Sequence, residues 1–342
     1  MKANVRLKIL VTREVFDEVL EYLRQHFDVD ANQEDIQLDE ATLATRLSDK
    51  NGVMTAITDR VDEKLLLRCP KLKTVCNMAV GYNNIDLVAC SARGVMATNT
   101  PGVLDETTAD FTWALILAAS RRLTEAEAYL RNGQWKRWQL KQIMGTDVHG
   151  KTLGILGMGR IGQAVAKRAL GFDMTVIYHN RQRLPENIER SCRAKYVNFG
   201  ELLGQSDILT LHLPYSASAH HVIGSKELAQ MKPGAILINA ARGGIVDDEA
   251  LVAVLSTGKI AAAGLDVYEN EPKLHPGFLK LKNVVLSPHI ASSSRTTRLA
   301  MAMKAAENLV AALTTGKPPN LLNPEVKPKS RTAEDAKGAE EI

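Results

Sequence analysis

The sequence predicts an α/β protein built from two doubly wound parallel sheets. Short apolar segments alternate with amphipathic helical segments from the N-terminus to about residue 100, and a second series of the same kind begins at Lys151. This alternation is typical of parallel sheets that carry helices on both faces. A region of different composition separates the two series, and a length of 342 residues is enough for two domains.

The elements of the first series follow from the periodicity of its apolar residues. The segment 15–27 places Val15, Val19, Leu23 and Phe27 on one face of a helix. Short apolar runs bounded by polar residues favour strands. Strands are therefore expected at 7–11, 53–57, 74–79 and 95–97, and further helices at 62–68 and 85–92.

The linking region starts where Thr100-Pro101-Gly102 interrupts the alternation, and a long helix is expected at 105–121. The segment 122–148 carries Trp135 and Trp138 among polar residues. Because aromatic residues often anchor protein interfaces, one interpretation is an arm that packs on a second subunit. A surface loop with tucked-in aromatic side chains explains the same composition equally well.

The second series predicts a sheet with close to the usual six strands of a doubly wound domain. An Ala-rich helix at about 292–313 follows it, and the residues beyond 318 are rich in Pro, Lys and Glu. Because such a segment has little apolar surface to bury, disorder is expected over 326–342. The strands are expected at 153–156, 175–178, 208–213, 235–239, 261–265 and 284–286.

Composition and charge argue against several classes of protein. A hydrophobic content of 45%, a charged content of 24% and a net charge of +4 are typical of a soluble globular protein, and no nucleic-acid partner is expected. The N-terminus is polar and the longest apolar segment, 111–119, is too short to span a bilayer, so no membrane association is expected. Cys69, Cys76, Cys90 and Cys192 show no metal-ligand spacing. These features favour a cytoplasmic enzyme without a structural metal.

A glycine-rich turn, Gly157-Met158-Gly159-Arg160-Ile161-Gly162, lies between an expected strand and an expected helix. In this context the first glycine permits a tight turn, the second lets the backbone approach a phosphate, and the third lets the helix pack on the strand. The helix N-terminus adds free N–H groups and positive potential for a pyrophosphate. A dinucleotide site is therefore predicted; the alternative is a strand–helix turn that binds nothing.

The loop after the next strand indicates which dinucleotide is bound. An Asp or Glu at this position would accept hydrogen bonds from the adenosine ribose of NAD. The sequence instead has Asn180, Arg181 and Arg183, and arginine can bind a 2′-phosphate through paired charge-assisted hydrogen bonds. NADP(H) is therefore expected to be preferred, with NAD(H) possible. The alternative is a solvated loop on a protein that binds NAD and discriminates weakly.

Candidate catalytic residues follow three of the expected strands. Arg242, Glu271 and His289 each lie just past the end of a different strand. Ligands of open α/β sheets bind beside the carboxyl ends of the strands, so these side chains are expected to converge next to the nicotinamide. Glu269 lies in the same loop as Glu271 and competes with it for the same role.

Several motifs together form a specific pattern: the glycine turn, Asn239-Ala240-Ala241-Arg242-Gly243, Gly264-Leu265-Asp266-Val267-Tyr268 with Glu271-Pro272, and Ser287-Pro288-His289. With them the sequence resembles the D-isomer-specific 2-hydroxyacid dehydrogenase family, over about residues 50–323. The resemblance implies a Rossmann cofactor domain, 101–287, inserted into a flavodoxin-like substrate domain made of 1–100 and 288–325.

Two further segments, Gly145-Thr146-Asp147-Val148 and Tyr178-His179-Asn180-Arg181, are most similar to the glyoxylate/hydroxypyruvate reductase and 2-ketogluconate reductase branch. The resemblance implies NADPH-dependent reduction of glyoxylate, hydroxypyruvate or 2-ketogluconate to a D-2-hydroxy acid by hydride transfer. Arg242 would clamp the substrate carboxylate and polarise the carbonyl. His289 would donate a proton to the carbonyl oxygen, and Glu271 would keep the imidazole charged and oriented.

Other roles are also carried over from the family. Val80 and Gly81 would hold the substrate carboxylate through backbone N–H groups, in a cleft that closes to exclude water. A homodimer would form through the cofactor domain, with Trp135 and Trp138 as candidates for reaching the partner's pocket. The expected cofactor contacts are Thr108, Gly157, Gly159, Arg160, Ile161, Gly162, Asn180, Arg181, Arg183, Pro214, Ala240, Arg242, Asp266 and His289.

Two other functions stay open at this point. An NAD-linked 2-hydroxyacid dehydrogenase, such as a phosphoglycerate dehydrogenase, is disfavoured because no acidic residue follows the second strand of the cofactor domain. A non-enzymatic dinucleotide-sensing scaffold, similar to family members that act as transcriptional co-repressors, is disfavoured because Arg242, Glu271 and His289 are all present. Oxidation of NADPH by a 2-keto acid distinguishes an enzyme from such a scaffold.

Overall fold

The chain forms two compact units, each built around one parallel sheet. The computed structural model describes residues 6–327, so the disorder expected over 326–342 falls on residues that lie, apart from the first two, outside the described part. The first unit runs to Leu104 and resumes at Ser294, and the second unit is Asp105–Ser293. Both sheets are entirely parallel in their strand pairing, which confirms the predicted fold class.

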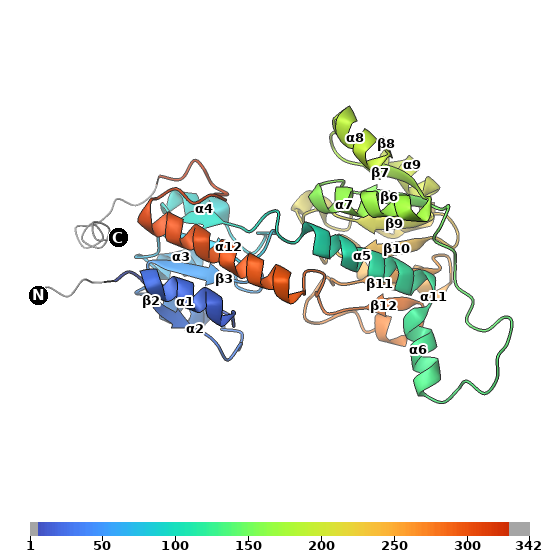
Figure 1. Ribbon diagram of the computed structural model, residues 1–342, viewed down its shortest axis with the longest axis horizontal. Coiled ribbons are helices and arrows are strands. Elements are labelled where there is room, and N and C mark those ends of the chain that lie inside the picture. The colour runs from blue at the N-terminus through green and yellow to red at the C-terminus, as the bar shows by residue number, and fades with distance from the viewer. Residues whose placement is uncertain (1–5, 328–342) are drawn as a thin grey trace, which may run out of the picture. The chain divides into compact units, whose positions relative to one another are not determined.

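The first unit has a five-stranded sheet in the flavodoxin-like order β2-β1-β3-β4-β5. The helices α1 and α12 lie side by side in this unit (Figure 1). Its strands are β1 (Lys8–Val11), β2 (Asp28–Ala31), β3 (Gly52–Thr55), β4 (Thr74–Asn77) and β5 (Met96–Thr98). Its helices are α1 (Asp17–His26), α2 (Glu40–Leu47), α3 (Glu63–Arg68), α4 (Leu87–Ala92) and α12 (Arg295–Thr314).

Alternate residues of the strands build two apolar layers in this unit. Ile9 and Val11 of β1 pack with residues of α1 and α12, whereas Leu10 packs with residues of α2, α3 and α4. This is the two-residue period of a strand that is buried on both faces. The last helix therefore returns to complete the core of the N-terminal segment.

Two elements of the first unit were not predicted from the sequence. The strand β2 reads Asp-Val-Asp-Ala, is only partly buried and lies at the edge of the sheet, where it pairs with β1. Pairing with a neighbour, rather than its own composition, makes it a strand. The helix α2 is capped by Asp39, whose side chain accepts the Thr42 N–H at 2.7 Å.

The second unit has a seven-stranded sheet in the order β12-β11-β10-β9-β6-β7-β8, which is the Rossmann order with one added strand. Its strands are β6 (Thr152–Leu156), β7 (Thr175–His179), β8 (Ala194–Tyr196), β9 (Ile208–Leu211), β10 (Ile236–Asn239), β11 (Ala262–Leu265) and β12 (Val284–Leu286). Its helices are α5 (Asp105–Ser120), α6 (Leu123–Arg131), α7 (Arg160–Ala169), α8 (Glu186–Cys192), α9 (Phe199–Gln205), α10 (Ser225–Gln230) and α11 (Asp248–Ser256).

The prediction of about six strands was short by one. The missing strand, β8, has three residues, Ala-Lys-Tyr, and pairs with β7 at the edge of the sheet. So short a segment carries no periodicity that could identify it. The helices α5 and α7 pack on one face of this sheet, and α9, α10 and α11 contribute to the apolar layer on the other.

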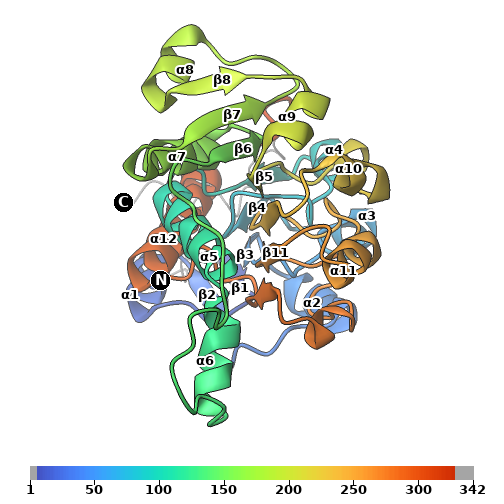
Figure 2. The ribbon, with the colours of Figure 1, turned by 90° about the vertical axis from the view of Figure 1, so that its right-hand side faces the viewer.

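The segment 122–148 begins as the helix α6, which projects away from the sheet of its own unit and leads into a long loop (Figure 2). The side chains of Trp135 and Trp138 are 52% and 73% exposed. The interpretation as a loop with tucked-in aromatic residues is therefore wrong for these two side chains. None of the helices in the described part has the length and apolar character needed to cross a membrane.

Candidate active site

The glycine turn joins β6 to α7, and close backbone contacts leave no room for a side chain at its first and third glycines. A Cβ on Gly157, whose φ is +95°, would lie 2.8 Å from the His212 backbone, and one on Gly162 would lie 2.7 Å from the Gly157 oxygen. A Cβ on Gly159 would meet nothing within 4 Å. No side chain caps the N-terminus of α7 at Gly159, so the first N–H groups of the helix face an open space. A pyrophosphate group fits this surface.

The loop after β7 is tied to the glycine turn. The Asn180 Oδ1 accepts the Met158 N–H at 2.6 Å, and the Asn180 carbonyl accepts the Tyr196 hydroxyl at 3.3 Å. Arg181 is exposed and makes no ion pair within residues 6–327. Arg183 instead pairs with Glu189 through two hydrogen bonds, of 2.9 and 2.7 Å. The three residues expected to contact the ribose end of the cofactor therefore have different surroundings.

A histidine–glutamate pair follows β11 and β12. The His289 Nδ1 lies 2.8 Å from the Glu271 Oε2, and the Glu271 Oε1 accepts the Tyr268 N–H at 2.9 Å. Burial by itself would raise the pKa of Glu271, but the hydrogen bond and charge of His289, the Tyr268 N–H and the charge of Arg242 outweigh it. The pKa of Glu271 therefore lies below its usual value, and the group is a carboxylate at neutral pH.

The loop that carries His289 is held by Asp266. This side chain is fully buried, and its two oxygens accept hydrogen bonds from the Ser287 hydroxyl at 2.6 Å and from the backbone N–H groups of Ile290 and Ala291 at 2.9 and 2.8 Å. The His289 N–H in turn bonds to the Asp266 carbonyl. Asp266, which was expected to contact the cofactor, thus anchors the histidine loop.

The loop of Arg242 is fixed by its neighbours. The Asn239 side chain donates to the Arg242 carbonyl and accepts the Ala241 N–H, both at 3.1 Å. A Cβ on Gly243 would lie 1.7 Å from the Tyr268 oxygen, so this loop runs directly against the one that leads to Glu271. Burial lowers the pKa of Arg242 and the charge of Glu271 opposes that shift, which places the two charges within electrostatic reach of each other.

A second histidine–glutamate pair lies beside the first. The His221 Nε2 is 2.9 Å from the Glu269 Oε1, and the His220 and His221 rings stack with centroids 3.9 Å apart. Glu269, the competitor for the role of Glu271, is therefore engaged with a different histidine. The ligand atoms of His220, His221 and Glu269 lie within 4.8 Å of one another. Because parallel stacked rings do not aim their nitrogens at one point, a shared metal ion would require these side chains to rotate.

The other expected cofactor contacts lie on elements of the second unit around this edge of the sheet. Thr108 is buried in α5, Ala240 follows β10, and Pro214 follows β9. His212, in the same segment as Pro214, has its pKa lowered to about 4 by burial and is therefore neutral, and it lies 3.0 Å from the Thr210 hydroxyl.

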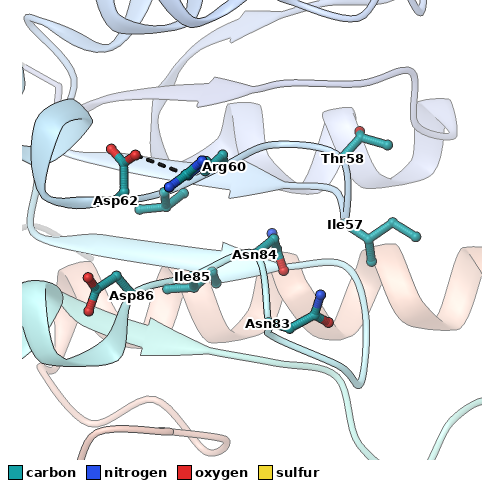
Figure 3. A pocket seen from close by; sticks show the side chains of 9 residues that line it. Ile57, Thr58, Arg60, Asp62, Asn83, Asn84, Ile85 and Asp86 are labelled. Carbon is teal, nitrogen blue, oxygen red and sulfur yellow. Dashed lines mark ion pairs between the residues drawn. The ribbon is translucent and has the colours of Figure 1, made fainter. Parts of the chain in front are cut away.

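In the first unit, amide side chains fix the loop after β4 that contains the expected carboxylate-binding residues. The Asn77 Nδ2 donates to the Gly81 carbonyl and the Asn99 Nδ2 to the Val80 carbonyl, each at 2.8 Å. The same loop borders a cavity of about 400 Å³, in which Arg60 and Asp62 form an ion pair of 3.1 Å (Figure 3). Val80 and Gly81 do not line this cavity, which is formed by Ile57, Thr58, Arg60, Val61, Asp62, Asn83, Asn84, Ile85 and Asp86.

Reasoning from the sequence missed several supporting residues. Asn239 was recognisable, because an Asn at the end of a strand often caps the following turn. Ser287 and Tyr268 lie inside the quoted motifs, but their hydrogen bonds to Asp266 and to the Ser287 carbonyl depend on side-chain directions. Glu189 had no signal, because its pairing depends on how α8 is rotated against β7.

Comparison with known proteins places this geometry in a family. Residues 113–291 match the model of the D-isomer specific 2-hydroxyacid dehydrogenase, NAD binding domain. A glyoxylate reductase of Aeropyrum pernix is 49% identical over 94% of this chain and 97% of its own length, and one of Thermococcus litoralis is 44% identical over 93% and 97%. A crystal structure of an NADPH-dependent glyoxylate/hydroxypyruvate reductase from Sinorhizobium meliloti with NADP and malonate superposes with a TM-score of 0.85 at 34% identity, covering 96% of this chain and 99% of that one.

These relatives cover nearly the whole chain, and the matched family model spans the segment that contains the glycine turn, Arg242, Glu271 and His289. The resemblance seen in the motifs is thereby confirmed. The chain belongs to the D-isomer specific 2-hydroxyacid dehydrogenase family and is an NAD(P)-dependent enzyme of that family.

Proposed function

We propose that the protein reduces glyoxylate, and related small 2-keto acids such as hydroxypyruvate or 2-ketogluconate, to D-2-hydroxy acids with NADPH as the preferred cofactor. The observation that carries the proposal is the arrangement of Arg242, Glu271 and His289 on adjacent loops of the second unit. Relatives named glyoxylate reductase, with identities of 40–49% over nearly the full chain, support the substrate class.

The proposed mechanism uses one positive clamp and one proton donor. A bound nicotinamide cofactor would supply the hydride that the carbonyl carbon receives. Arg242, partly buried and cationic, binds the substrate carboxylate and draws electron density from the carbonyl oxygen. His289 gives its proton to that oxygen, and Glu271 balances the imidazolium charge and fixes the ring through Nδ1. The Nε2 of His289 is then the atom that faces the substrate.

Each unit has one backbone surface that we propose binds a ligand. In the first unit, Val80 and Gly81 supply N–H groups to the substrate carboxylate from a loop whose carbonyls are already bound by Asn77 and Asn99. In the second unit, the open N-terminus of α7 at Gly159 receives the pyrophosphate. The absence of an acidic residue after β7, together with Arg181, supports the preference for NADPH.

Initial rates with glyoxylate, hydroxypyruvate, 2-ketogluconate and pyruvate, each with NADPH and with NADH, test the proposal. We expect a higher kcat/KM with NADPH than with NADH and the highest turnover on one of the first three acids. No oxidation of NADPH by any of the four acids, in a protein that binds the cofactor, would contradict the proposed reaction. Equal kcat/KM for the two cofactors would contradict the preference alone.

A further inference from the structure

A compact network holds the segment that connects β7 to α8. Tyr178, at the end of β7, is fully buried; its hydroxyl donates to the Glu189 Oε1 at 2.6 Å and accepts the Leu184 N–H at 2.9 Å. The Glu189 side chain comes from α8 and is only 8% exposed. The conformation of the loop between Asn180 and Leu184 is therefore tied to one buried carboxylate.

Arg183 is the cationic member of this network. Its Nε and Nη2 bond to the two oxygens of Glu189 at 2.9 and 2.7 Å, while the guanidinium remains 64% exposed. The hydrogen bonds of Arg183 and Tyr178 lower the pKa of Glu189 to about 2, and burial raises the pKa of Tyr178 to about 12. At neutral pH the network is thus an arginine–carboxylate pair with a neutral phenol.

Arg181 shares the exposure of Arg183 but lacks a partner such as Glu189 among the described residues. It lies two residues earlier in the same loop, it is exposed, and it makes no ion pair within the described part of the chain. Its neighbour Asn180 bonds to the Met158 N–H and so keeps this part of the loop against the glycine turn. The positive charge of Arg181 is uncompensated and lies close to the predicted dinucleotide site.

We propose that Glu189 is a specificity-determining residue, which neutralises Arg183 and leaves Arg181 as the arginine that binds the cofactor's 2′-phosphate. This inference rests on the proposed preference for NADPH. A neutral Arg183–Glu189 pair attracts a dianionic phosphate much less than a free arginine does, because the carboxylate repels what the guanidinium attracts. Glu189 therefore limits the selectivity of the loop while it fixes the loop's shape.

The proposal predicts opposite effects for two substitutions. Arg181→Ala removes the free charge and should weaken binding of a 2′-phosphate by about tenfold or more, the size of a charge-assisted contact. Glu189→Gln keeps an amide oxygen for the Tyr178 hydroxyl but removes the negative charge, so Arg183 becomes available. We expect tighter 2′-phosphate binding by about three- to fivefold, the size of one exposed ion pair.

A double variant separates neutralisation from direct contact. In Arg183→Met/Glu189→Gln both charges of the pair are gone, and the net charge of the loop is that of the wild type. If the Arg183–Glu189 pair neither attracts nor repels the phosphate, the affinity of the double variant for the 2′-phosphate should lie within about twofold of the wild-type affinity. If Arg183 itself holds the phosphate, the double variant should lose as much affinity as Arg181→Ala.

Calorimetric titration with adenosine 2′,5′-bisphosphate and with 5′-AMP measures the effect, because the two probes differ only in the 2′-phosphate. For the wild type and each variant, the readout is the dissociation constant for 5′-AMP divided by the dissociation constant for adenosine 2′,5′-bisphosphate. Glu186→Gln is the matched control: it removes the same charge from the same helix, where Glu186 pairs with Arg190 instead. Thermal melts establish that each variant is folded.

Three results together would support the proposal. The ratio should be larger in Glu189→Gln than in the wild type, unchanged in the double variant and in Glu186→Gln, and near one in Arg181→Ala. An unchanged or smaller ratio in folded Glu189→Gln, or a loss of selectivity in the folded double variant, would overturn it. A wild-type ratio near one would overturn the NADPH preference and the assignment of Arg181. Even then, an increase in Glu189→Gln would identify Arg183 as a neutralised charge.

Discussion

Two histidine–glutamate pairs lie on neighbouring loops, and only one of them is proposed to move a proton. His289 pairs with Glu271 and His221 with Glu269, at 2.8 and 2.9 Å. We predict that His289→Ala lowers kcat for 2-keto acid reduction by about 10²–10⁴-fold, the usual value of general acid catalysis. His221→Ala, which breaks an equivalent pair, should lower it by less than about tenfold. Steady-state kinetics with glyoxylate measure both.

The cofactor dissociation constant is the control for these variants, and it should change little in either, since neither histidine is placed at the pyrophosphate end of the site. Equal losses of kcat in the two variants would contradict the assignment of the proton donor. Such a result would indicate that the pairs act by holding loops rather than by transferring a proton.

Arg242 provides a test of geometry rather than of charge. Its side chain is partly buried, and its loop is fixed by Asn239. Arg242→Lys keeps the positive charge but loses the planar fork that can bind a carboxylate through two hydrogen bonds. We predict a fall in kcat/KM of about 10²-fold or more, with NADPH affinity retained in fluorescence titration. A variant with nearly wild-type kcat/KM would show that only a point charge is needed.

For single residues, the sequence identified the candidate site residues better than it identified their contacts. The placement of Arg242, Glu271 and His289 after strand ends follows from the sheet topology, which the apolar pattern predicts. The surroundings of Asp266 and Arg183 do not follow from it. Both are bound by groups of the protein itself, through side-chain directions that periodicity does not contain.

For the β6–α7 turn, we expect cofactor binding to depend on the absence of a side chain at Gly159. A methyl group on Gly159 would meet nothing within 4 Å in the protein, and the φ of Gly159 is −77°. We predict that Gly159→Ala leaves the melting temperature almost unchanged but weakens NADPH binding by about tenfold or more, because the methyl group would occupy the space proposed for the pyrophosphate.

Gly171→Ala is the matched control for this substitution. Gly171 also has open space at its Cβ position and follows the C-terminal end of α7 rather than preceding its N-terminus. It should change neither the melting temperature nor cofactor affinity by much. If Gly159→Ala binds NADPH as tightly as the wild type, the pyrophosphate does not approach this residue.

The helix α8 contributes a pH dependence of stability through Glu189. Its pKa is lowered to about 2 by Arg183 and Tyr178, whereas the pKa of an unfolded glutamate lies near the ordinary value of 4.5. The stabilisation is fully present above the unfolded value and is lost as the pH falls toward the folded value. We predict that the wild type loses unfolding free energy more steeply than Glu189→Gln between about pH 5 and pH 3, measured by urea denaturation. Parallel pH profiles would contradict this role.

Most elements could be predicted because they are long or strongly apolar. The elements that were missed lack such an apolar pattern. The strands β2 and β8 lie at sheet edges, and each is defined by hydrogen bonds to a neighbour. An edge strand is exposed on one side and needs no continuous apolar run. The helix α2 has only three buried residues in eight, which is too few for periodicity to identify with certainty.

For the whole molecule, the topology of both sheets agrees with the predicted fold class, and the boundary at Asp105 lies a few residues after the break at Thr100-Pro101-Gly102. The return of the chain to the first unit occurs at Ser294, just before α12. A nested order of this kind is not contained in local periodicity. It entered the sequence interpretation only through the resemblance to the family.

The arm 122–148 gives the prediction that concerns assembly. Trp138, Leu140 and Met144 are large apolar side chains left exposed on this segment of the second unit. Because exposed aromatic and apolar clusters are typical of interface cores, we propose that the arm packs on a second copy of the chain.

Trp138→Ser with Leu140→Ser should convert the dimer to monomer, or raise its dissociation constant by at least about tenfold, in light scattering coupled to size exclusion. Val88→Ser is the control, because Val88 is 81% exposed but lies in the first unit, and it should leave the mass unchanged. A wild-type protein that is monomeric at micromolar concentration, or a double variant that remains dimeric, would contradict the assignment of the arm.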